Sequence, residues 1–123
     1  MRLVLDSDPR IYTIRQYAAG SIVVGDQVLQ RACIVSAERL VADWSPASPA
    51  ELDDAALAAL LVLQPSIILL GTLQSHAPPP RSLVSGLQRR GIAVETMNLG
   101  AACRTYNVLV QDRRPVVAGL FPV

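Results

Sequence analysis

The residues that could do chemistry gather in the second half of this 123-residue chain, beside the ends of apolar runs. One run, Ile67–Leu70, stops at a glycine and a threonine, and further polar residues follow the run Ile92–Thr96. Open α/β sheets bind ligands beyond the carboxyl ends of their strands, so we expect a pocket there. Its predicted members are Gly71, Thr72, Asn98, Cys103, Arg104, Thr105 and Asn107. They make no complete catalytic set, and we assign no catalytic residue.

Cys103 has two interpretations. It stands near the predicted start of a helix, where the helix dipole and unpaired N–H groups lower the pKa of a thiol, and Arg104 adds to that effect. On this basis it is a nucleophile or a redox-sensitive thiol. The alternative is a small buried apolar residue, which cysteine very often is. No second cysteine or histidine lies nearby in the sequence to act as resolving group or base, which favours the buried thiol.

Arg104 also has two interpretations, and they carry equal weight. A helix N-terminus and a guanidinium converge their N–H groups on one point, so Arg104, Thr105 and Asn107 could bind an anion. Alternatively, Arg104 pairs with an internal carboxylate, for which Glu95 is the nearest candidate along the chain. Trp44 is similarly either an anchor for a partner or a residue that closes one end of the core, and we favour the core.

The composition excludes several classes of function. A net charge of +1 gives no electrostatic basis for binding nucleic acid or a membrane surface. All 11 basic residues are arginine, so no lysine can form a Schiff base or complete a P-loop. The single histidine, His76, precludes a His-rich metal site, and Cys33 and Cys103 lack metal-ligand spacing. We therefore predict no metal and no cofactor.

The length fits one domain over residues 1–123. The hydrophobic fraction is 51% and the mean hydropathy +0.36, yet no apolar run approaches the roughly 18 residues of a membrane span. An acidic residue at Asp6 comes too early for a signal peptide. We expect a soluble cytoplasmic protein with reduced thiols, and an apolar face reserved for a partner or a second subunit.

The first third of the chain reads as mainly β. Residues 1–19 are expected to be a weakly ordered lead-in, with a strand as the alternative for its second half. Two β-rich runs flank Gly25-Asp26, which predicts a hairpin. Alternating apolar residues predict further strands as far as Trp44.

Helices and strands alternate over the rest. Ser48 is the predicted N-cap of a helix that runs to Leu63, with Glu51 as its capping partner. The other predicted elements are a central strand at Ile67–Leu70, a helix after Pro80 capped by Gly91, a strand at Ile92–Thr96, a helix from about Asn98 and a last strand at Val116–Phe121. The strand–helix–strand unit from Ile67 to Thr96 should be a right-handed parallel crossover.

Three blocks of the chain resemble a known family. They are Gly71-Thr72, Gly91–Asn98 and Ala101–Leu109, and they are similar to the small domains of unknown function that include the mitochondrial NADH:ubiquinone oxidoreductase complex assembly factor 3. The resemblance covers about residues 20–122. It implies a three-layer α/β fold with a central mixed five-stranded sheet, one strand of which is antiparallel to the others, and a β-hairpin layer. It implies no established enzymatic activity, and a mitochondrial member that binds partner proteins.

Two departures from the family pattern concern the expected pocket. Leu73 stands where members usually have glycine, and Leu99 where they tend to have threonine. Both make the pocket less polar and argue against a conventional phosphate site. We therefore expect a non-enzymatic protein-binding or assembly module, whose partner is another protein or a second subunit. The alternative is a small-molecule or anion-binding protein or enzyme that uses the Gly71-Thr72 and Cys103-Arg104 positions.

Overall fold

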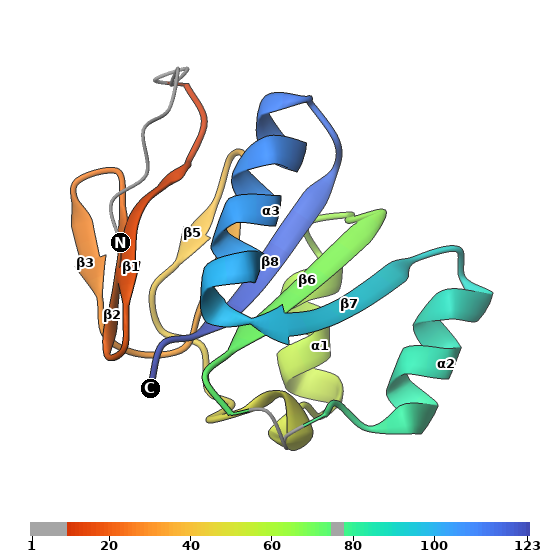
Figure 1. Ribbon diagram of the computed structural model, residues 1–123. Coiled ribbons are helices and arrows are strands. Elements are labelled where there is room, and N and C mark those ends of the chain that lie inside the picture. The colour runs from red at the N-terminus through yellow and green to blue at the C-terminus, as the bar shows by residue number, and fades with distance from the viewer. Residues whose placement is uncertain (1–9, 75–77) are drawn as a thin grey trace.

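The computed structural model describes residues 10–74 and 78–123 of the chain, so the predictions for His76 and for residues 1–9 lie outside the described residues. Two β-sheets and three α-helices make up the described part (Figure 1). The strands are β1 (Ile14–Ala18), β2 (Ser21–Val24), β3 (Gln27–Leu29), β4 (Cys33–Ser36), β5 (Leu40–Val41), β6 (Ile67–Thr72), β7 (Ala93–Asn98) and β8 (Val116–Phe121). The helices are α1 (Asp54–Leu61), α2 (Arg81–Arg89) and α3 (Leu99–Gln111), and a 3-10 turn, η1, spans Pro49–Glu51.

The central sheet has the strand order β5-β4-β8-β6-β7. β6 runs parallel to both β7 and β8, whereas β4 runs antiparallel to β5 and β8. One strand is therefore antiparallel to the other four, as expected. All six residues of β8 are buried, because this strand has neighbours on both sides and helices cover both faces of the sheet. The predicted parallel crossover from β6 through α2 to β7 is confirmed.

The smaller sheet has the order β1-β2-β3. Val24 and Gln27 are paired, so the hairpin turn is Gly25-Asp26, as predicted. Gly25 has a φ of +57°, a value that glycine adopts without steric cost at the first position of a tight hairpin turn. The strand given as the alternative for the second half of the lead-in is present, because Ile14–Ala18 forms β1 of this sheet. The later strands end earlier than predicted, with β5 stopping at Val41.

The molecule has three layers, and two apolar clusters hold them together. On one face of the central sheet, α3 and the smaller sheet bury a cluster that includes Ile14, Ile22, Leu99 and Tyr106. On the other face, α1 and α2 bury a cluster built around Trp44, Leu52, Leu60, Leu87 and Phe121. Figure 1 shows α3 in front of the central sheet, with the smaller sheet beside it and α1 behind. No described helix is both long enough and apolar enough to cross a bilayer.

The start of α1 differs from the prediction. Ser48 precedes only the 3-10 turn, and its side chain makes no capping hydrogen bond. The N-cap of α1 is Asp53, whose carboxylate accepts a 2.8 Å hydrogen bond from the backbone N–H of Ala56. Leu52, between η1 and α1, has an extended backbone and is 5% exposed, so its burial interrupts the helix predicted from Ser48.

The end of α2 and the start of α3 agree with the prediction. The loop after α2 passes through Gly91, which has a φ of +78° as a C-terminal glycine requires. Asn98 caps α3, since its Oδ1 accepts a 2.8 Å hydrogen bond from the N–H of Ala101.

Candidate functional site

The expected pocket corresponds to a hollow at the carboxyl ends of β6 and β7. These strands end side by side, with Thr72 in register with Asn98. A hollow of about 410 Å³ lies there, lined by Thr72, Leu73, Gln74, Pro78, Thr96, Met97 and Asn98. The chain leaves β6 towards α2 on one face of the sheet and leaves β7 directly into α3 on the other. Such a divergence leaves a crevice between adjacent strand ends.

Two polar side chains of this hollow already have hydrogen-bond partners. The Thr72 hydroxyl accepts a 3.0 Å hydrogen bond from the N–H of Gln74, and Asn98 is occupied as the N-cap of α3. Leu73 is 47% exposed at the rim, whereas Leu99 is buried in the core behind it. Of the seven predicted residues, only Thr72 and Asn98 line this hollow.

Gly71 serves the packing of α3. A Cβ atom at this position would lie 2.5 Å from the Cβ of Ala102 and 3.0 Å from Cδ2 of Leu120. Glycine therefore allows the first turns of α3 to approach β6 closely. The Gly71-Thr72 pair ends a central strand as predicted. Gly71, however, allows the close packing of α3 and does not line the hollow.

Cys103 lies in the core. It is the fifth residue of α3, past the first turn of the helix, and is 0% exposed. Burial raises the pKa of its thiol to about 12, an effect that the neighbouring Arg104 only partly offsets. Cys33, on β4, is also free and buried, and burial together with Cys103 raises the pKa of its thiol to about 12. The buried thiol is thus the correct interpretation for Cys103, and the activated thiol is wrong.

Arg104 points outward and contacts Tyr17 of β1. Its Nη1 donates a 2.5 Å hydrogen bond to the Tyr17 hydroxyl, and the guanidinium carbon lies 5.9 Å from the centre of the Tyr17 ring. The ring also covers Gly100, where a Cβ would lie 2.8 Å from it. Glu95 is exposed on β7, and the interpretation in which Arg104 pairs with Glu95 is wrong, because the guanidinium bonds to Tyr17 instead. Thr105, the next residue, is half-buried.

Asn107 joins α3 to β1. Its Oδ1 accepts a 2.8 Å hydrogen bond from the N–H of Ile14, and its Nδ2 donates a 2.9 Å hydrogen bond to the Ile14 carbonyl. Asn107 is 3% exposed, so the amide substitutes for a neighbouring strand at the edge of β1. The preceding residue, Tyr106, donates a 2.8 Å hydrogen bond from its hydroxyl to the carbonyl of Tyr12. Both side chains therefore hold the segment that leads into β1 against α3.

The structure thus separates the seven residues predicted as one site. Thr72 and Asn98 line the strand-end hollow. Gly71, Cys103 and Asn107 lie in packed interior positions, Thr105 is half-buried, and Arg104 is on the surface. No local pattern indicated the contact with Tyr17, which lies far from Arg104 along the chain. Within residues 10–74 and 78–123, no group of three His, Cys, Asp or Glu side chains could hold a metal ion.

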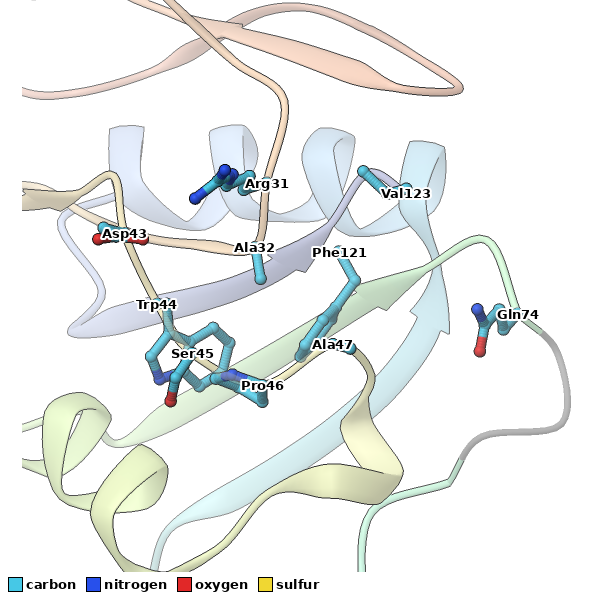
Figure 2. Close-up of a pocket in the computed structure, with 10 residues that line it drawn as sticks. All are labelled: Arg31, Ala32, Asp43, Trp44, Ser45, Pro46, Ala47, Gln74, Phe121 and Val123. Atoms are coloured by element: carbon cyan, nitrogen blue, oxygen red, sulfur yellow. The ribbon is translucent and has the colours of Figure 1, made fainter.

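A second hollow, of about 580 Å³, lies above Trp44 and Phe121 (Figure 2). Trp44 is fixed there, because its Nε1 donates a 3.2 Å hydrogen bond to the Ala56 carbonyl and its ring centre lies 5.3 Å from that of Phe121. Arg31 and Asp43 are exposed at the rim. Trp44 therefore closes one end of the core, as favoured from the sequence, and forms the floor of this hollow.

Comparison with known proteins identifies the family. The profile of the family described as "Protein of unknown function (DUF498/DUF598)" matches residues 14–121, which include every α-helix and β-strand of the structure. The chain belongs to this family. An NMR structure of a Xanthomonas campestris family relative has the same fold, with 32% sequence identity and a TM-score of 0.81 over 97% of this chain and 92% of that one.

Two curated relatives carry names of different kinds. One is the Xenopus tropicalis protein named NADH dehydrogenase [ubiquinone] 1 alpha subcomplex assembly factor 3, which is 26% identical over 98% of this chain. The chain spans 66% of the length of that relative, slightly less than two thirds. The other, from Francisella tularensis, is named 13 kDa major membrane protein and is 37% identical over 46% of each chain.

Proposed function

We propose that this domain is a non-enzymatic module that binds another protein, as an assembly factor binds the subunits of a larger complex. The name of the Xenopus relative supports this role, and its match extends over nearly the whole of this chain. The buried, high-pKa thiol of Cys103 supports it too, because the side chain that most resembled a nucleophile is neutral and inaccessible at physiological pH. We also propose a cytoplasmic location, which the two free buried cysteines favour because thiols stay reduced there.

The observation that carries this proposal is the outward surface of α3. Arg104 is exposed there and its guanidinium is held on Tyr17, while Val108, one helical turn further on, is 66% exposed. Arginine and tyrosine are enriched among the residues that dominate binding energy at protein interfaces. A guanidinium already fixed by a ring also loses little side-chain entropy when a partner binds. This α3 surface is the proposed contact.

The experiment is capture of partners from native extract, with the whole chain as bait and quantification by mass spectrometry. Arg104→Ala should lose the specific partner yet change the free energy of unfolding by no more than about 0.5 kcal/mol, since its side chain is on the surface. Arg89→Ala, an exposed arginine on α2, is the matched control and should keep the partner. An unchanged set of partners with Arg104→Ala would exclude the α3 surface as the contact.

A second candidate function is binding of a small molecule or anion at the strand-end hollow. Its volume of about 410 Å³ and its place between the diverging strand ends favour this alternative. A thermal-shift screen with nucleotides, phosphate and common carboxylic acids tests it. A ligand present at 100 times its dissociation constant should stabilise the protein by about 2.7 kcal/mol. A hit that Thr72→Val abolishes, without a specific protein partner, would favour this function over the binding module.

A further inference from the structure

The two described sheets have four edge strands, and three of them are short or covered. β5 has two residues and β3 has three. At the edge of β1, Asn107 occupies both the N–H and the C=O of Ile14, and the strand is irregular between Ile14 and Gln16. Natural proteins use short, irregular or covered edges to prevent pairing with another chain.

β7 lacks these devices. It has six residues in unbroken parallel register with β6, and within the described chain β6 is its one strand neighbour. Figure 1 shows it as the outermost strand of the central sheet. Its sequence, Ala93–Asn98, contains no proline or lysine, and its one charge is Glu95. A regular edge of this kind is a template for another strand.

We propose that β7 pairs antiparallel with β7 of a second copy of this chain, which joins the two five-stranded sheets into one of ten strands. This self-pairing goes beyond the proposed function, which concerns a different protein and the α3 surface. A two-fold axis perpendicular to the sheet relates the copies, so each face of one sheet continues into the same face of the other. Residues that lie opposite one another must then point to the same face.

The side chains of β7 determine the register. Met97 packs in the cluster on the α3 face and Val94 in the cluster on the other face, so by alternation Glu95 points to the α3 face and Thr96 to the opposite face. A register centred on Glu95 would place two carboxylates directly opposite each other, which is destabilising.

Moving the axis to Thr96 removes that repulsion. Each Thr96 then lies opposite its counterpart, a favourable cross-strand pair. Glu95 of each copy lies opposite Met97, and Val94 opposite Asn98. β7 can therefore pair with a second copy of itself without placing like charges opposite each other, and this is the reason for assigning that occupant.

The test places charges on the proposed axis. Sedimentation of the purified wild-type chain from micromolar to near-millimolar concentration should show a monomer of 13.2 kDa in equilibrium with a species of twice that mass. Thr96→Glu and Thr96→Arg should each weaken the dimer by at least about tenfold, because like charges then face each other. Mixing the two variants in equal amounts should restore the dimer, since opposite charges now meet. Thr96 is exposed, so both variants should fold.

Matched controls are Gln27→Glu and Gln27→Arg, at an exposed position of the short edge strand β3, and both should dimerise like the wild type. A wild-type chain that stays monomeric, charged Thr96 variants that still dimerise, or a mixture that stays monomeric would each overturn the proposal. A monomeric chain that still captures a partner through Arg104 would overturn this inference alone. A dimer that captures no partner would instead count against the proposed function alone.

Discussion

Replacing Asn107 should detach the start of the smaller sheet from α3. In the structure this buried amide bonds both backbone groups of Ile14, at 2.8 and 2.9 Å. Asn107→Ala removes both partners and leaves the N–H and C=O of Ile14 without hydrogen bonds. Ile14 is 0% exposed, so water cannot replace the amide without opening the interface.

The expected loss follows from those two groups. A buried backbone group left without its partner costs about 1–3 kcal/mol, so the two together cost about 2–6 kcal/mol of unfolding free energy. Domains are typically stable by roughly 5–15 kcal/mol, which makes this a large fraction. Asn107→Asp keeps the acceptor for the Ile14 N–H but places an oxygen against the Ile14 carbonyl. Only the protonated carboxyl can donate there, so this variant should recover stability relative to the wild type as the pH falls towards about 3.9.

Urea unfolding followed by fluorescence of Trp44, the one tryptophan, measures the effect. Asn98→Ala is the control, since it removes the exposed asparagine that caps the same helix with one hydrogen bond, and it should cost about 1 kcal/mol. Hydrogen exchange at the Ile14 amide should accelerate far more in Asn107→Ala than in the control. A loss below about 0.5 kcal/mol, or an Ile14 amide that stays protected, would refute the reasoning.

Three further predictions concern packing, the thiol and the start of α1. Gly71→Ala should lower the free energy of unfolding by about 1–3 kcal/mol, because its Cβ would lie 2.5 Å from that of Ala102, and Ala102→Gly in the same chain should recover part of the loss in urea titrations. Cys103 should react slowly with a thiol reagent in the native state and rapidly in denaturant. Because burial raises its pKa to about 12, the stability that this thiol contributes is complete below pH about 8.5, the pKa of an exposed thiol, and is lost as the pH rises through 12. Rapid labelling of the native protein near neutral pH would contradict both statements. Asp53→Ala should cost about 0.5–2 kcal/mol and Ser48→Ala much less, so equal shifts in denaturation midpoint would show that the cap is misassigned.

Local patterns predicted most of the elements because the signals act over a few residues. The Gly25-Asp26 turn, the Asn98 cap and Gly91 after α2 each meet a backbone requirement of their own segment. The predicted start of α1 was wrong, because Ser48 and Asp53 are both residues of the kind that caps a helix N-terminus. Burial of Leu52 between them decided in favour of Asp53, and burial against a distant cluster is not a local property.

The sequence by itself determined the class of the fold, the order of its elements and the absence of lysine chemistry, since these follow from composition and periodicity. The tertiary structure decided what the polar residues do. Arg104 meets Tyr17 across 87 positions, and Asn107 meets Ile14 across 93. Side chains that are neighbours along α3 therefore point into different environments, because successive residues of a helix face different directions. Residues close together in sequence looked like one site, and the helix distributed them between a packed core and an exposed surface.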